Sequence, residues 1–210
     1  MSANPISGMD ALRKLQDGNA RFVEGNRCIG SYLSRTRLGQ HVEGQAPYAV
    51  VLGCSDSRVP VEIIFDAGLG DLFVIRVAGN IVAPSLIGSI ELAAEKFGAR
   101  LVIVLGHTGC GAVDLTLQAL ESPVAGSSHN VNSIIDYIRP SVEELLASGD
   151  VTSRDDLWAS AVRANVCRSA DNLRHGSETL ERLIGDDGLM IVGAEYSLET
   201  GVVHIFDGLP

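Results

Sequence analysis

The stretch YAVVLGCSDSR at residues 48–58 and the stretch LVIVLGHTGCG at residues 101–111 share one layout. Each begins with a run of apolar residues and continues through glycine into polar residues. Such runs are typical of strands buried on both faces of a parallel sheet, so we expect strands at 48–52 and 101–105. In open α/β sheets ligands bind at the carboxyl ends of the strands, which is where these polar residues stand. The two stretches therefore predict an α/β fold and the edge of the sheet that carries function.

The surrounding sequence supplies the other strands and the helices between them. A third apolar run covers residues 72–77, and a helical pattern over 85–97 is followed by Gly98, which suits a glycine C-cap. This strand–helix–strand order predicts right-handed crossovers and a mostly parallel central sheet flanked by helices. Further helices are expected at 130–147, 155–174 and 177–184, and a closing hairpin of strands at 189–196 and 202–206 with a turn at 198–201.

The N-terminal part predicts an amphipathic helical arm. Apolar residues recur on one side at helical spacing from Ser7 to Gly25, with Ser7 as N-cap and Asp10 three residues later. The polar, glycine-containing residues 26–47 predict a loop. We therefore expect one domain over residues 1–210, with an N-terminal arm and loop at 1–45 and an α/β core at 46–210.

Composition and charge exclude several classes of protein. The chain has 210 residues, of which 46% are hydrophobic and 20% charged, as in an ordinary folded domain. A net charge of −10 argues against nucleic-acid binding, which draws its affinity from clustered Lys and Arg. The chain shows neither a secretory signal nor a stretch long enough to span a bilayer. We therefore expect a cytoplasmic protein with no nucleic-acid or membrane partner.

Cysteine and histidine at the two strand ends predict a metal site. Four cysteines are too few for a disulfide scaffold, and cytosolic conditions keep thiols reduced. His107 and Cys110 form an H-x-x-C pair that one ion can bridge, and Cys54 would add a third ligand from the neighbouring strand end. Zinc suits mixed sulfur and nitrogen ligands, and three protein ligands leave a fourth position open for catalysis. The plainer interpretation is a buried thiol and a core histidine.

Asp56 and Arg58 follow Cys54 in the same loop and leave three interpretations open. Asp56 could ligate the metal, orient a metal-bound hydroxide or pair with Arg58. The planar guanidinium group suits a bidentate pair with a carboxylate and could hold Asp56 off the metal. A plain ion pair that only ties down the loop is the structural alternative.

In the order and spacing of these motifs, the sequence resembles the β-class carbonic anhydrases. The resemblance covers the catalytic core over residues 48–113, with C-x-D-x-R beginning at Cys54 and H-x-x-C beginning at His107. It implies an α/β fold whose N-terminal helical arm packs on a partner subunit, in a homodimer or homotetramer. It also implies one zinc ion per subunit and the reversible hydration of carbon dioxide to bicarbonate and a proton, by attack of zinc-bound hydroxide.

The resemblance also implies roles for individual residues. Asp56 and Arg58 would form a gating pair beside the zinc ion, with Phe73 contributed to the pocket across the dimer interface. The implied zinc ligands are Cys54, His107 and Cys110, and the implied substrate-binding residues are Gln45, Phe73, Ala78 and Gly111.

Two positions depart from patterns found within the family. Leu92 stands where plant-type members have a pocket tyrosine, so that hydroxyl is missing here. Some members bind bicarbonate at a second, inhibitory site built from a Trp, an Arg and a Tyr. Arg76 and Tyr196 are present, but Val51 takes the place of the Trp, so we expect no such site in its usual form. Arg76 is then interpreted as a structural ion-pair residue and Tyr196 as a strand anchor.

Two other functions fit the same ligands. A hydrolase of carbonyl sulfide or carbon disulfide shares the fold and zinc site, so the ligands alone do not separate it from a carbonic anhydrase. A non-catalytic zinc or redox-sensing protein would need a fourth Cys or His to close the metal shell, and neither Cys28 nor Cys167 stands in a suitable motif. The remaining histidines are expected at the surface: His41, His129, His175 and His204.

Overall fold

A five-stranded sheet forms the centre of the molecule, with the strand order β2-β1-β3-β4-β5. The first four strands are parallel and β5 runs antiparallel to β4, which confirms the predicted mostly parallel sheet. The computed structural model describes residues 6–26, 42, 44–121, 128–148 and 153–209. The strands are β1 (Ala49–Gly53), β2 (Leu72–Arg76), β3 (Leu101–His107), β4 (Met190–Tyr196) and β5 (Val203–Asp207).

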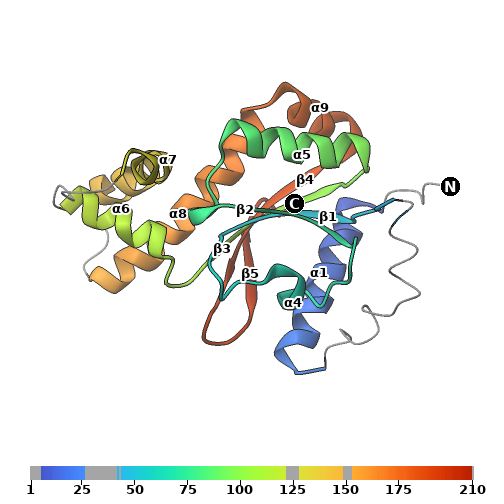
Figure 1. Cartoon of the computed structure of the whole chain (residues 1–210), viewed down its shortest axis with the longest axis horizontal. Helices are drawn as coiled ribbons and strands as arrows, with labels where there is room; N and C mark the ends of the chain where they lie inside the picture. The colour runs from blue at the N-terminus through green and yellow to red at the C-terminus, as the bar shows by residue number, and fades with distance from the viewer. Residues whose placement is uncertain (1–5, 27–41, 43, 122–127, 149–152, 210) are drawn as a thin grey trace.

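Helices cover both faces of the sheet and extend beyond its carboxyl edge, as Figure 1 shows. Helices α1 and α4 lie on one face and α5, α8 and α9 on the other, whereas α6 and α7 stand beyond the strand ends together with the first part of α8. None of the described helices is long and apolar enough to cross a membrane. Their bounds are α1 Gly8–Val23, α4 Val61–Ile64, the 3-10 turn η1 Ala78–Asn80, α5 Pro84–Lys96, α6 Gly111–Glu121, α7 His129–Ser148, α8 Arg154–His175 and α9 Glu178–Asp187.

The five strands and the five helices that the sequence predicts are present, with ends shifted by a few residues. Helix α5 ends as expected, because Gly98 adopts a φ of 71° that other residues rarely reach. The sequence analysis missed α4, η1 and α6. The first two are too short to show a period, and the glycine-rich start of α6 conceals its helical pattern. Most of the loop predicted at 26–47, including Cys28 and His41, lies outside the described residues.

Helix α1 begins as predicted, and the chain's own sheet covers its apolar face. The Ser7 side chain accepts the Asp10 N–H and donates to the Asp10 carboxylate, which forms the N-cap. Leu12 and Leu15 are at most 2% exposed and pack into a cluster with side chains of β1 and β3. The side chain of Asn19 donates to two backbone carbonyls of the same chain. The chain's own sheet therefore buries this face, and the packing of the arm on a partner subunit stays a prediction.

Three groups of buried apolar side chains hold the layers together. One lies between the sheet and α1 with α4, and a second lies between the sheet and α5, α8 and α9. The third joins α6, α7 and α8 and includes Cys54 and Cys110. The carboxyl edge of the sheet is thus packed under helices, so Cys54, His107 and Cys110 are buried, whereas Ser55, Ser57 and Arg58 in the same region are exposed.

Candidate metal centre

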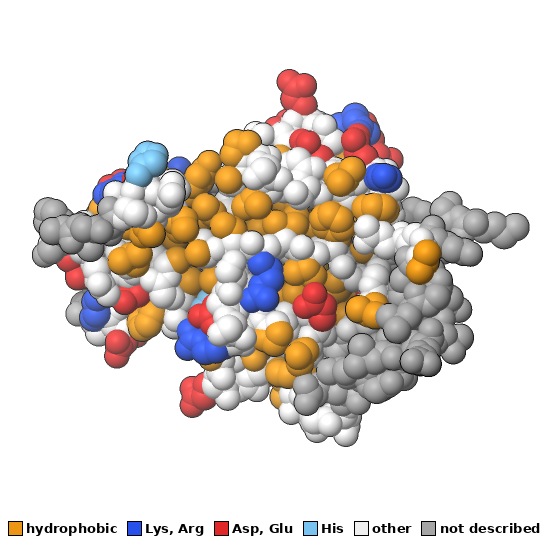
Figure 2. All heavy atoms as spheres, viewed as in Figure 1, with side chains coloured by type: hydrophobic (Ala, Val, Ile, Leu, Met, Phe, Trp, Pro, Cys, Tyr) orange, Lys and Arg blue, Asp and Glu red, His pale blue; other side chains and the backbone are white. Residues whose placement is uncertain are grey.

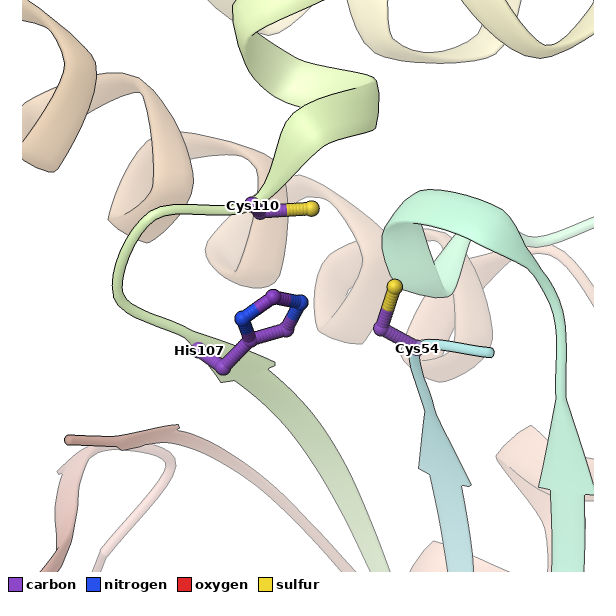
Figure 3. A group of neighbouring side chains, drawn as sticks. All are labelled: Cys54, His107 and Cys110. Carbon is purple, nitrogen blue, oxygen red and sulfur yellow. The ribbon is translucent and has the colours of Figure 1, made fainter. Parts of the chain in front are cut away.

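Three side chains able to bind a metal meet at the carboxyl edge of the sheet (Figure 3). Cys54 directly follows β1, His107 is the last residue of β3, and Cys110 directly precedes α6. Because β1 and β3 are adjacent parallel strands, their ends bring Cys54 and His107 to the same place. The ligand atoms of the three residues all lie within 4.8 Å of one another, and all three residues are buried. The cluster predicted from the two motifs is therefore formed by one chain.

The His107 ring is oriented so that only one of its nitrogens has a protein partner. Nδ1 lies 3.0 Å from the backbone oxygen of Thr108, a contact that a protonated Nδ1 satisfies. Nε2 is buried and has no hydrogen-bond partner within the described part of the chain. A buried polar atom without a partner costs free energy unless another group satisfies it. A metal ion at Nε2 would do so, since metal-ligating histidines commonly hold their other nitrogen in this way.

The surroundings of the two cysteines favour negative charge on sulfur. The Gly79 N–H donates to Cys54 Sγ at 3.4 Å, and Cys110 precedes the first turn of α6, where backbone N–H groups favour an anion. Hydrogen bonding with Cys110 lowers the pKa of Cys54 to about 4, whereas Cys54 and burial raise the pKa of Cys110. Of the two thiols, Cys54 therefore loses its proton more readily. A dication would release the second proton and bind two thiolates.

Asp56 lies beside the three candidate ligands and is held by Arg58. The Arg58 Nε and Nη2 atoms donate to the two carboxylate oxygens at 2.9 and 2.7 Å, and its backbone N–H donates to one of them at 2.9 Å. These hydrogen bonds hold the pKa of Asp56 well below its usual range, so the carboxylate is ionised at neutral pH. Its Oδ2 atom lies 3.9 Å from His107 Nε2, which is outside hydrogen-bonding range.

Two further residues, which the sequence analysis had not placed at the site, hold its loops. Arg76 donates to the backbone oxygens of Cys54 at 3.0 Å and Asp56 at 2.6 Å, so it holds the loop through carbonyls rather than through the ion pair that we expected. Trp158 of α8 donates from Nε1 to the backbone oxygen of Cys110 at 3.0 Å. No sequence signal marks Trp158, because the packing of α8 over the strand ends brings it there.

The four residues predicted to bind substrate divide into two pairs. Ala78 begins η1, one residue before the N–H donor to Cys54, and Gly111 directly follows Cys110 at the start of α6. Gln45 precedes β1 on the amino side of the sheet, and Phe73 lies near the amino end of β2 opposite Val50. The length of the strands therefore separates Gln45 and Phe73 from Cys54 within one chain.

Gln45 and Phe73 belong to a different part of the surface. A groove of about 580 Å³ is lined by residues that include Gln45 and Phe97, and the Phe73 ring centre lies 6.0 Å from that of Phe97. Leu92, at the position where plant-type members have a pocket tyrosine, is 49% exposed on α5. The side chains of Gln45, Phe73 and Leu92 lie outside the buried cluster that contains Cys54.

The described histidines other than His107 lie at the surface as expected, and the absence of a second bicarbonate site stays a prediction. The three histidines that the structure describes besides His107 are exposed: His129, His175 and His204. Val51 is fully buried in the core, and Tyr196 is 6% exposed with burial raising its pKa. These positions supply no Trp–Arg–Tyr group of the inhibitory kind.

Comparison with known proteins identifies the family. The family model described as carbonic anhydrase matches residues 49–203. The chain is a member of the β-carbonic anhydrases. Carbonic anhydrase 2 of Mycobacterium tuberculosis is 38% identical over 200 residues, which cover 95% of this chain and 92% of the relative. The carbonic anhydrase of Mycolicibacterium smegmatis is 38% identical over 205 residues, with 97% and 94% covered. The predicted enzyme class is confirmed.

Solved carbonic anhydrases share the fold. A β-carbonic anhydrase of Aspergillus fumigatus superposes with a TM-score of 0.74 at 25% identity, covering 96% of this chain and 91% of the other. One of two tetrameric β-carbonic anhydrases of Sordaria macrospora gives a TM-score of 0.75 at 20% identity, with 94% and 97% covered. At the lower identity the likeness shows the fold alone.

Proposed function

We propose that this carbonic anhydrase holds one zinc ion per subunit on Cys54, His107 and Cys110 and interconverts carbon dioxide and bicarbonate there. The observation that supports this most is the buried, unpartnered Nε2 of His107 beside two cysteine sulfurs. Two sulfurs and one imidazole suit zinc. Within the described residues no fourth Cys or His joins the group. That leaves a coordination position for water and favours a catalytic site over a closed structural one.

Asp56 and Arg58 would orient the nucleophile beside the metal. Zinc, when bound, supplies a hydroxide near neutral pH by lowering the pKa of a water molecule. An ionised carboxylate only accepts hydrogen bonds, so Asp56 can fix the direction of a hydroxyl group next to it. The two donors of Arg58 hold the carboxylate in one orientation. The same pair would keep Asp56 from binding the metal as a fourth ligand.

We propose that the apolar side of the substrate pocket comes from a second subunit in a homodimer or homotetramer. β2, which carries Phe73, is at the edge of the described sheet, with β1 as its strand neighbour. Figure 2 shows a band of hydrophobic side chains across the middle of this face, over the region of α5 and β2. Such bands mark protein interfaces. The Sordaria enzymes are described as tetrameric, which supports an assembly of several subunits. In such an assembly Gln45 and Phe73 would reach a neighbour's site.

Zinc content measured together with stopped-flow carbon dioxide hydration tests the proposed site. The parent should carry about one zinc per subunit, and replacing any one of the three ligands by Ala should remove most zinc and all measurable hydration, since a three-ligand site cannot spare one. Cys167→Ala is the matched control, because Cys167 is a free cysteine outside the cluster. Full zinc and parental activity in a ligand variant would refute the ligand set. Zinc without hydration in the parent would favour a non-catalytic site.

A further inference from the structure

The η1 turn, whose Gly79 N–H donates to Cys54, is itself held by two side chains of α8. The Gly79 N–H donates a hydrogen bond to Cys54 Sγ, and the Gly79 carbonyl accepts a hydrogen bond of 2.8 Å from Asn165 Nδ2. The next carbonyl, of Asn80, accepts from the Ser169 hydroxyl at 3.1 Å. Asn165 and Ser169 stand one helical turn apart and are only 2% and 4% exposed. A chain of contacts therefore runs from the buried face of α8 through η1 to the Cys54 sulfur.

The backbone of η1 has an uncommon conformation that its surroundings must maintain. Gly79 has a φ of 71° and Asn80 a φ of 43°, the left-handed region that residues other than glycine seldom adopt. Gly79 is also tightly enclosed, because a Cβ atom there would lie 2.7 Å from Ile138 Cδ1 and 3.1 Å from Ala112 Cβ. A strained turn of this kind persists only where several neighbours fix it.

The polar character of Asn165 and Ser169 points to a purpose beyond the stability of α8. Asn is a poor helix former in a helix interior, and a buried amide or hydroxyl costs free energy unless it is hydrogen-bonded. An apolar side chain at either position would pack without that cost. Both side chains instead donate to consecutive carbonyls of the turn that faces Cys54.

We propose that Asn165 and Ser169 are positioning residues for the metal site, which they reach through the Gly79 and Asn80 peptides. By fixing the two carbonyls they keep the Gly79 N–H directed at the Cys54 sulfur. That hydrogen bond sets the direction of the sulfur and withdraws charge from a thiolate, as outer hydrogen bonds do at metal sites. The inference rests on the proposed zinc site and extends its support to α8. Losing either donor weakens the hold on the ion and changes the sulfur's electronic contribution to it.

Zinc release into an excess of chelator, and the absorption spectrum of the cobalt(II)-substituted protein, test this inference. In Asn165→Ala we expect zinc to leave about tenfold faster than in the parent, with a smaller acceleration in Ser169→Ala. The sulfur-to-cobalt charge-transfer band should shift in both variants. The matched controls are Asn19→Ala and Ser141→Ala, because Asn19 and Ser141 are also buried and also donate to backbone carbonyls. Both controls should keep the parental zinc release and cobalt spectrum.

Thermal unfolding of the metal-free proteins separates positioning from general stability. If Asn165→Ala and Asn19→Ala lower the melting temperature alike but only Asn165→Ala changes zinc release and the cobalt spectrum, the inference holds. Parental release rates and spectra in Asn165→Ala and Ser169→Ala would overturn it while the zinc site itself stands. Should Asn165→Ala fail to fold, Ser169→Ala decides by the same criteria. A parent that binds no zinc would overturn the proposed function and this inference together.

Discussion

The carboxyl and amino ends of the parallel strands differ in how many of the predicted site residues a single chain brings together. At the carboxyl edge, Cys54, His107 and Cys110 are buried within 4.8 Å of one another. At the amino edge, Gln45 is exposed and Phe73 is only partly buried near an edge strand. A five-residue strand spans about 16 Å, so residues before and after it cannot share a pocket in one chain. Proximity in sequence to a ligand therefore says little about proximity in space.

Mixed subunits would test this difference most strongly. Cys54→Ala should be inactive, and Gln45→Ala should lose about tenfold in activity if it loses one hydrogen bond to the substrate. If Gln45 serves the partner's site, a mixed dimer of the two variants regains one intact site. Randomly paired subunits, co-produced in equal amounts, should then recover about a quarter of the parental rate of carbon dioxide hydration.

The same mixture distinguishes the alternative in which each chain completes its own pocket. In that case every zinc-containing subunit lacks Gln45, and the mixture has only the average rate of the two separate variants. A mixture of Cys54→Ala with His107→Ala is the control, since no pairing of those subunits restores an intact ligand set. Recovery of activity there would point to contaminating parental enzyme rather than to shared sites.

A smaller effect is expected from Arg58→Ala, which acts within the carboxyl edge. The pKa of Asp56 should rise toward its ordinary value but stay below 7, so Asp56 remains ionised. Activity should therefore fall because the carboxylate is no longer held in one position, and not because it becomes protonated. With zinc bound, an Asp56 carboxylate freed from its guanidinium partner would compete with hydroxide for the metal. The hydration rate of the parent should rise from neutral to alkaline pH. The rate of Arg58→Ala should be lower than the parental rate, and the difference should be larger near neutral pH than at alkaline pH. Stopped-flow pH–rate profiles of both proteins measure this.

The stability of the same variant gives an independent check on the ion pair. Because the Asp56 pKa is lower in the folded state, the pair stabilises the fold above the unfolded pKa of about 3.9 and ceases to do so as pH falls through the folded value. The melting temperatures of the parent and Arg58→Ala should therefore differ at pH 7 and converge in acid. Parental behaviour of Arg58→Ala in both measurements would leave Arg58 as a surface residue without a gating role.

The smallest expected effects come from replacing two glycines at the carboxyl edge of the sheet by alanine. Gly79→Ala should cost about 1–3 kcal/mol of unfolding free energy, because the added Cβ meets Ile138 and φ is positive. Gly111→Ala should leave stability nearly unchanged, since its Cβ would meet nothing within 4 Å. Denaturant unfolding measures both. A loss of hydration by Gly111→Ala at unchanged stability would support its predicted place in the substrate pocket, and a destabilised Gly111→Ala would contradict this account of the space around it.

Local sequence patterns predicted those helices and strands that show a hydrophobic period or a capping residue in their own sequence. The aliphatic runs before Cys54 and His107 predicted β1 and β3, and Ser7 predicted the start of α1. The short η1 turn escaped because three residues hold no period. Trp158 and Asn165 escaped for another reason: both lie on α8, and their contacts at the site depend on how that helix packs on the strand ends.

The sequence by itself determined the family, the α/β class and the meeting of three ligands at one edge of the sheet. It could do so because two strand-and-loop motifs place Cys54 and His107 at the carboxyl ends of parallel strands, and parallel direction puts those ends at the same edge. The structure adds that β1 and β3 are neighbours. Only the tertiary structure decided what covers helix α1, that Gln45 and Phe73 lie away from the cluster, and that α8 supports Cys54 through η1. Those outcomes depend on how side chains that are distant in sequence pack against one another, and the spacing of residues within one segment does not determine that packing.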